Sequence, residues 1–239
     1  MIKASKDERI VVFDASTLIT LAMNNLAYVL HDLKNNVSGL RFVAPESVKF
    51  ESVKRPLKIP QFRFNALRVK ELFDSGIVES PDILSISSQD INVEAKRISS
   101  VVNNYFFCED KPVGLIHSGE TDCLAICVIL NKRGVDNVLA VDERTTRVLG
   151  ENPENVRKLL RNKTCRVVFR KKGDVGNLDE LRRISYIRSP EIVFVAWENG
   201  FIKPKTRENL EAAFHALQFK GASISEGEIR KLVSLAKKK

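Results

Sequence analysis

The sequence of 239 residues lacks the apolar stretches that mark membrane and secreted proteins. No run approaches the roughly 18 consecutive apolar residues that a helix needs to cross a bilayer. The N-terminal segment MIKASKDER is charged and has no apolar core of the kind found in a secretory signal peptide. We therefore expect a cytoplasmic protein that does not associate with membranes.

Cysteine and histidine are scarce, with four and three residues respectively, and neither shows the spacing of a metal site. CxxC pairs are absent. Cys123 and Cys127 share one face of a predicted helix, where we expect small apolar core residues in a reducing compartment. The histidines are isolated from one another in the sequence, so each is expected in a structural or surface role. His117, in a predicted loop, could still reach a site.

The glycine-rich loops that bind phosphate groups are also missing. Neither GxGxxG nor GxxxxGK followed by Ser or Thr occurs in the chain. Phosphatases with an aspartate nucleophile carry a second Asp two positions after the first, but Ser16 stands two positions after Asp14. These absences leave the carboxylates and the basic residues as the groups that carry functional information.

Basic residues are in excess, and they are unevenly distributed. The chain has 39 Lys and Arg against 30 Asp and Glu, a formal net charge of +9. Residues 151–239 hold 20 basic and 11 acidic side chains, so the first 150 residues carry no net charge. Clustered Lys and Arg are typical of proteins that bind polyanions, although a basic surface that serves only solubility shows the same excess.

Predicted strands and helices alternate along most of the chain. The apolar β-forming runs predict strands at 10–13, 40–44, 77–80, 138–141 and 165–169. Apolar periodicity, capping residues and stop signals predict helices at 18–33, 65–74, 87–104, 120–133 and 152–162, with a loop at 110–119. Ser87 and Asp90 approximate a capping box at the start of the helix at 87–104. This alternation predicts an α/β fold with a central parallel sheet covered by helices on both faces.

The composition of the sequence changes near residue 172, where the polar run RKKGDVGN contains two glycines. Helices are predicted beyond it at 177–187, 189–199, 206–219 and 225–238. The last of these begins with a capping box formed by Ser225 and Glu228. We therefore divide the chain into an α/β domain at 1–172 and a basic helical C-terminal region at 173–239.

Two of the predicted strands end in acidic residues. The run at 10–13 ends at Asp14, and the run at 138–141 is followed by Asp142 and Glu143. Buried strands rarely end in a carboxylate without a partner. Ligand sites of open α/β sheets lie at the carboxyl ends of the strands. The sequence therefore predicts one acidic pocket at this edge.

Three further acids lie in neighbouring helices. Glu51 follows Pro45 in a short predicted helix, and Glu120 and Asp122 lie in the first turn of the helix before the second acidic strand. First-turn acids also stabilise a helix N-terminus without any functional role. Several carboxylates in one crevice require a positive charge to remain ionised. With no His or Cys ligand pattern, we expect Mg²⁺ or Mn²⁺, which prefer oxygen ligands.

Four sequence segments together resemble the motifs of PIN-domain nucleases. VVFDASTLI resembles the first motif, with Asp14 followed by a small residue and Ser16. VAPESVKFE resembles the second motif, a Pro-led helix with an inward Glu, which is Glu51 by spacing or Glu46 as second choice. GETDCLAI and AVDERTTR resemble the third and fourth motifs, two acids one residue apart and an acidic pair followed by basic residues. The resemblance covers residues 8–170.

The resemblance implies a three-layer α/β/α fold with a central parallel sheet and divalent-metal-dependent endonucleolytic cleavage of RNA. It implies that the main acids, both catalytic and metal-binding, are Asp14, Glu51, Asp122 and Asp142. Glu120 and Glu143 would be accessory metal ligands. Ser16 would orient the first acid or the scissile phosphate, and Ser16, Arg144 and Arg147 are the expected substrate-binding residues. The 71 residues from the second to the third motif and the extra residues 173–239 depart from the compact family pattern.

We therefore expect an endoribonuclease that hydrolyses RNA phosphodiesters through a carboxylate-bound Mg²⁺ or Mn²⁺, in RNA processing or decay. One alternative is a non-catalytic RNA-binding or assembly module on the same fold. Another is a toxin-type ribonuclease controlled by a small inhibitory protein partner. The sequence leaves a homo-oligomer open and does not name the RNA.

Overall fold

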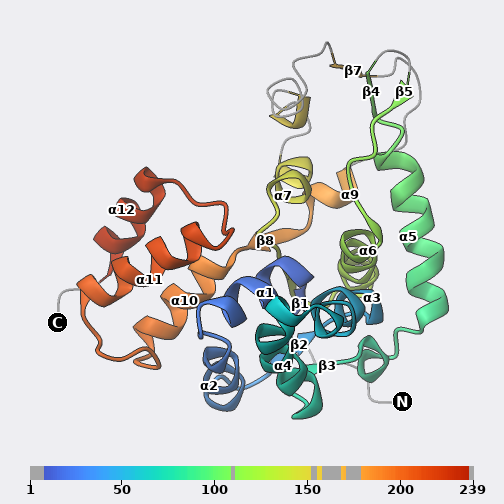
Figure 1. Ribbon diagram of the computed structural model, residues 1–239. Coiled ribbons are helices and arrows are strands. Elements are labelled where there is room, and N and C mark those ends of the chain that lie inside the picture. The colour runs from blue at the N-terminus through green and yellow to red at the C-terminus, as the bar shows by residue number, and fades with distance from the viewer. Residues whose placement is uncertain (1–7, 109–110, 152–154, 158–167, 171–178, 237–239) are drawn as a thin grey trace.

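The computed structural model describes residues 8–108, 111–151, 155–157, 168–170 and 179–236 (Figure 1). Its centre is a parallel sheet of five strands in the order β3-β2-β1-β6-β8. The strands are β1 (Arg9–Phe13), β2 (Leu40–Val43), β3 (Val78–Glu79), β6 (Asn137–Ala140) and β8 (Ser185–Ile187). The order of strands reverses direction beside β1, so the crevice between the ends of β1 and β6 is the topological switch point of the sheet.

Helices cover both faces of this sheet. Helix α6 (Ser118–Lys132) packs on β1 and β6, and α5 (Ser88–Val102) lies on its outer side. Helices α2 (Tyr28–Asn36) and α10 (Ser189–Glu198) cover the opposite face, where their apolar side chains line a common cavity with Val11 and Phe13. Cys123 and Cys127 are buried in α6, as predicted for core residues. The α/β class and the parallel sheet are confirmed.

The remaining described helices connect these elements or extend beyond them. They are α1 (Ala15–Met23), α3 (Glu46–Lys49), η1 (Phe50–Lys54), η2 (Pro56–Lys58), α4 (Pro60–Asp74), η3 (Pro81–Leu84), α7 (Arg144–Glu151), α9 (Asp179–Arg182), α11 (Arg207–Phe219) and α12 (Glu226–Leu235). The capping boxes predicted at the starts of α5 and α12 are both present. None of the helices in the described ranges is both long and apolar enough to cross a membrane.

The single helix predicted at 18–33 is wrong, because the chain forms α1 and α2 with a break between them. Asn25 adopts a left-handed backbone conformation with φ of 58°, which Asn tolerates better than most residues. The N–H of Leu26 then bonds to the carbonyl of Leu21 at 2.8 Å and closes the turn. The apolar spacing continues across the break because both helices bury apolar residues in the same core.

The strand predicted at 165–169 lies partly outside the described residues, and its described end does not join the parallel sheet. Its described part, β7 (Val168–Arg170), pairs antiparallel with β4 (Phe106–Cys108), which pairs in turn with β5 (Lys111–Pro112). The predicted loop at 110–119 therefore contributes a strand. This second sheet projects from the body beyond one end of α5 and α6 (Figure 1).

The C-terminal region contributes a strand as well as helices. The helix predicted at 177–187 is wrong, because α9 ends at Arg182 and β8 then pairs with β6 in the parallel sheet. The helices predicted at 189–199, 206–219 and 225–238 are confirmed as α10, α11 and α12. Helix α10 ends one residue before the predicted bound, α11 begins one residue after it, and α12 runs from Glu226 to Leu235. The helix predicted at 152–162 lies mostly outside the described residues. The chain beyond residue 172 thus completes one edge of the sheet.

A buried arginine joins α10 to α12. The Arg188 guanidinium is paired with Glu191 in the first turn of α10 and with Glu228 of α12, the latter at 2.9 Å. It also donates to the carbonyl oxygen of Ser223 at 2.7 Å. Arg188 is only 8% exposed, so these bonds replace the water that the guanidinium loses on folding.

We expect the stability of the protein to fall in acid partly through Glu228. Burial acts to raise the pKa of Glu228, but bonds from the N–H and hydroxyl of Ser225 and the ion pair with Arg188 outweigh it and lower the pKa to about 2. A depressed folded-state pKa stabilises the fold above the unfolded pKa near 4.5, and this contribution is lost as pH falls towards 2. The Glu228→Gln variant should therefore be less stable than wild type at pH 7. The difference in unfolding midpoint should shrink between about pH 5 and pH 2, and a constant difference would contradict the assignment.

Candidate functional site

Asp14 lies at the centre of the candidate site, directly after the central strand β1. Its backbone N–H bonds to the carbonyl of Ala140 at 2.9 Å, which continues the β1–β6 pairing and fixes the carboxylate at the edge of the sheet. The carboxylate caps α1 by accepting the N–H of Ser16 at 2.9 Å and also accepts its hydroxyl. Asp14 is 4% exposed. Burial raises its pKa, and the charge of Glu143 adds to the effect.

Ser16 connects the two acidic strand ends. While its hydroxyl donates to Asp14, the same oxygen accepts the backbone N–H of Asp142 at 3.1 Å. The hydroxyl of Ser16 therefore holds the carboxylate of Asp14 next to the backbone of Asp142. One side chain therefore links the two strand ends in addition to the β1–β6 backbone pairing.

Glu51 reaches the site from the π-helical segment η1. Burial raises the pKa of Glu51, and so does the charge of Asp14. The N–H of Gly119 and the charges of His117 and Arg55 act to lower it. The carboxylate packs against the N-terminus of α6 so closely that a Cβ on Gly119 would lie 2.9 Å from its Oε2 atom. A helix N-terminus stabilises a carboxylate in this position.

Glu120 and Glu143 complete the group of coupled acids. Glu120 accepts the N–H of His117 at 2.7 Å in the capping box of α6. Burial raises its pKa to about 7, with further contributions from the charges of Asp14 and Glu143. Glu143 accepts the N–H of Thr146 at 2.9 Å at the start of α7.

Asp142 is buried at 3% exposure, but its carboxylate is bound by α10. Oδ1 accepts the N–H of Ser189 at 2.7 Å, and Oδ2 accepts the hydroxyl of Ser189 at 2.8 Å. Burial raises the pKa of Asp142, bonds from Ser189 and Thr20 oppose that rise, and the nearby charge of Glu191 adds to it. The second strand-end acid therefore faces α10 as well as the sheet edge.

The two remaining candidates, Asp122 and Glu46, have partners of their own. The carboxylate of Asp122 accepts the hydroxyl of Ser47 at 2.6 Å, and burial raises its pKa. Glu46 forms an exposed ion pair with Lys54. Of the two possible second-motif acids, Glu51 is therefore the one that lies in the field of Asp14.

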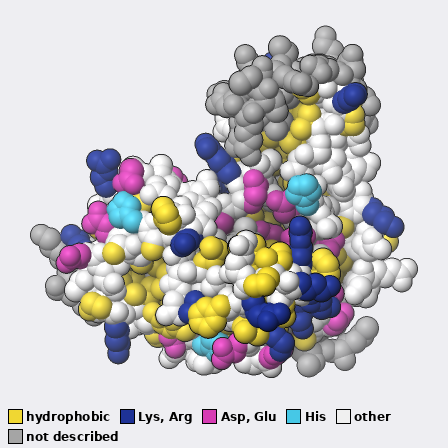
Figure 2. Space-filling model, in the orientation of Figure 1, with side chains coloured by type: hydrophobic (Ala, Val, Ile, Leu, Met, Phe, Trp, Pro, Cys, Tyr) yellow, Lys and Arg dark blue, Asp and Glu magenta, His cyan; other side chains and the backbone are white. Residues whose placement is uncertain are grey.

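Four of the six predicted metal ligands thus act on one another electrostatically, namely Asp14, Glu51, Glu120 and Glu143. Figure 2 shows acidic side chains with a histidine in the hollow between the projecting part and the body of the molecule. Within the described part of the chain, no three Asp, Glu, His or Cys side chains are close enough together to hold a metal ion. The acids are neighbours, but they are not arranged as a closed coordination shell.

The donor set of this site nevertheless fits a hard divalent cation. All of the predicted ligands are carboxylates, whose oxygens Mg²⁺ and Mn²⁺ prefer. Among the residues that the structure describes, no Lys or Arg forms an ion pair with Asp14, Glu120 or Asp142. Burial of carboxylates without a cationic partner is costly. The site therefore has excess negative charge that a cation would neutralise.

The predicted substrate contacts lie on α7 beside the acids. Arg144 is exposed at the first position of the helix, and Arg147 lies about one turn further on, half-buried and engaged with neighbouring groups. His117, expected in a structural or surface role with a possible reach to the site, lies exposed near Glu51. Exposed Arg144 and His117 are available to an anionic ligand.

Sequence reasoning missed the residues that hold the acids in place. Ser189 lies 47 positions from Asp142, and Ser47 lies 75 positions from Asp122. No spacing rule connects residues so far apart in the chain. Gly119 is a weak local signal, because a glycine in the first turn of a helix suggests a close approach by another group.

Replacement of Gly119 by alanine should separate activity from stability. The new Cβ would displace the Glu51 carboxylate, which can swing away, while alanine favours the helix by about 0.5–1 kcal/mol. We expect any cleavage activity to fall about 10- to 100-fold with an unchanged or higher unfolding midpoint. At Gly227, the equivalent second position of α12, an added Cβ would have no atom within 4 Å, so Gly227→Ala is the matched control. Equal activity of the two variants would contradict the role assigned to Glu51.

Comparison of the chain with protein-family models, with curated proteins and with solved structures finds no match. A function for the chain is therefore inferred from the residues and geometry described above.

Proposed function

We propose that this protein is a divalent-metal-dependent endoribonuclease of the PIN type. The observation that carries the proposal is the group of mutually repelling carboxylates around Asp14 at the switch point of the parallel sheet. Carboxylates whose pKa values are shifted by burial and by one another cluster at the functional sites of enzymes. The four motif resemblances in the sequence point to the same activity.

Each part of the site has a role in this proposal. Asp14, Glu51, Glu120 and Glu143 would hold the cation, which when bound would polarise a phosphate oxygen and activate a water molecule. Ser16 keeps Asp14 in one orientation. Arg144 would bind a phosphate of the RNA. Asp122 and Asp142 remain predicted ligands that would have to turn away from Ser47 and Ser189.

The charge distribution supports a polyanionic substrate. The net charge of +9 arises entirely from residues 151–239. A basic segment attracts RNA through its phosphates independently of base sequence, and such binding weakens steeply as salt is added. The site and the charge therefore suit binding followed by cleavage of the backbone.

The direct test is incubation of the full chain with a mixed pool of structured and single-stranded RNA in Mg²⁺, in Mn²⁺ or in EDTA. We expect internal cleavage that depends on the metal and stops in EDTA. Cleavage that continues in EDTA would point to a metal-independent nuclease and contradict the proposal. Absence of cleavage in both metals would also contradict it.

One structural observation favours a second candidate, a non-catalytic RNA-binding module on the same fold. The described residues contain no three potential ligands close enough to hold a metal ion, and Asp122 and Asp142 already have serine partners. Tight, salt-dependent RNA binding without cleavage in either metal would support this candidate over the nuclease.

A further inference from the structure

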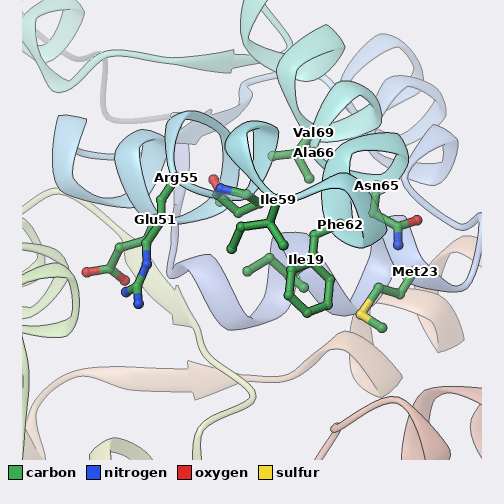
Figure 3. Close-up of a pocket in the computed structure, with 11 residues that line it drawn as sticks. Ile19, Met23, Glu51, Arg55, Ile59, Phe62, Asn65, Ala66 and Val69 are labelled. Atoms are coloured by element: carbon green, nitrogen blue, oxygen red, sulfur yellow. The ribbon is translucent and has the colours of Figure 1, made fainter.

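A cavity of about 300 Å³ lies beside the acidic site, between α1 and the segment η1–η2–α4. Its walls are mainly apolar and include Ile19, Met23, Ile59 and the ring of Phe62. Figure 3 shows these side chains along the cavity, with Glu51 and Arg55 at one end and Asn65 at the other. Cavities of this size and composition bind small molecules when a few polar groups orient them.

The cavity has unused polar groups at its two ends. Among the described residues, neither the guanidinium of Arg55 nor the side-chain amide of Asn65 has a hydrogen-bond partner or an ion pair within bonding distance. Phe62 is 42% exposed although its ring lines the cavity. An aromatic ring, a guanidinium plane and an amide are the groups with which proteins stack and read unpaired bases.

Glu51 belongs both to this cavity and to the acidic site. It lines one end of the cavity beside Arg55, and its pKa is raised by burial and by the charge of Asp14. A group that occupies the cavity is therefore next to any phosphate that reaches the acids. When a phosphate of a nucleic acid lies at the acids, the base of the adjoining nucleotide is the group close enough to enter the cavity.

We propose that this cavity receives one unpaired base of a single-stranded RNA, stacked on Phe62 and hydrogen-bonded by Asn65, beside the phosphate held at the acidic site. The inference rests on the proposed function for its substrate class. Arg55 lies at the end of the cavity next to Glu51 and would bind the phosphate that links the base to the site. A protein side chain would fill the apolar walls but would leave the hydrogen-bonding groups of Arg55 and Asn65 without partners.

The test uses binding in EDTA, so that it does not depend on cleavage. Short single-stranded RNAs carry the fluorescent base 2-aminopurine at one position each, and its emission responds to stacking. We expect one position to change its emission on binding to the full chain. Phe62→Ala should abolish that change and weaken binding of the oligonucleotide by about 5- to 150-fold, and Asn65→Ala should weaken the change.

Phe64→Ala is the matched control. Phe64 lies on the same helix, is 65% exposed, and its ring contacts Arg68 outside the cavity. The Phe64→Ala variant should bind the oligonucleotides with the affinity of the wild type and give the same change in 2-aminopurine emission. The inference is overturned if no 2-aminopurine position responds or if Phe64→Ala loses the response as fully as Phe62→Ala does. It is also overturned if Phe62→Ala leaves the response unchanged, which is the result expected of a cavity that takes a protein side chain.

Cleavage of the same oligonucleotides in Mg²⁺ and in Mn²⁺ reports separately on the proposed function. Cleavage without a position-specific response contradicts the base pocket alone. A position-specific response that requires Phe62, without cleavage in either metal, supports the pocket and contradicts the nuclease.

Discussion

Replacement of Asp14 by asparagine should abolish metal-dependent RNA cleavage while leaving the protein at least as stable as the wild type. Activity should fall by about 10²- to 10³-fold or more, because the variant removes a charge at the centre of the coupled acids. Stability should hold because asparagine caps a helix as well as aspartate does and can still accept the N–H of Ser16. It also removes a buried charge whose pKa burial raises.

The measurement pairs a cleavage assay with thermal unfolding and RNA binding. Asp136→Asn is the control, because Asp136 is an exposed aspartate just before the neighbouring strand β6. We expect it to behave as wild type in all three assays. An Asp14→Asn variant that cleaves normally, or that loses stability together with activity, would contradict a functional role for the buried charge.

Replacement of Arg188 by methionine should cause the largest loss of stability. The change leaves Glu191 and Glu228 without their shared partner and removes the bond to the Ser223 carbonyl. Breaking one side of a buried ion pair costs about 3–5 kcal/mol. Because Glu228 remains about half exposed, we expect about 2–3 kcal/mol in the free energy of unfolding.

A second variant distinguishes lost charge pairing from lost packing. Adding Glu191→Gln and Glu228→Gln to Arg188→Met should recover a large part of the stability, because no unpaired carboxylate remains. Denaturant unfolding measures both variants. If the triple variant is as unstable as Arg188→Met alone, the guanidinium acts mainly through packing.

The features predicted best from the sequence are those determined within a few residues. The strand before Asp14 and the strand before Asp142 are recognisable because apolar β-formers end in an acid. The capping boxes at Ser87 and Ser225 are recognisable because they span only four residues. These local signals locate the carboxyl edge of the sheet and most of its acids.

The features predicted worst depend on partners that are distant in the chain. Strand β7 and strand β8 are short, and nothing in either segment says which sheet it joins. The serine partners of Asp122 and Asp142 are also set by packing between remote segments. The identity of the acids can therefore be predicted from local patterns, but the direction in which each carboxylate points cannot.

The bond between Asp142 and Ser189 also determines when the site can be completed during synthesis of the chain. The two residues are 47 positions apart in the chain, and a ribosome adds about 5–20 residues per second. For about 2–10 s of synthesis, Asp142 therefore exists without the serine that fixes its carboxylate, and β6 lacks its neighbour β8. A nascent chain would carry an incomplete site while it is still next to the ribosome and the message that encodes it.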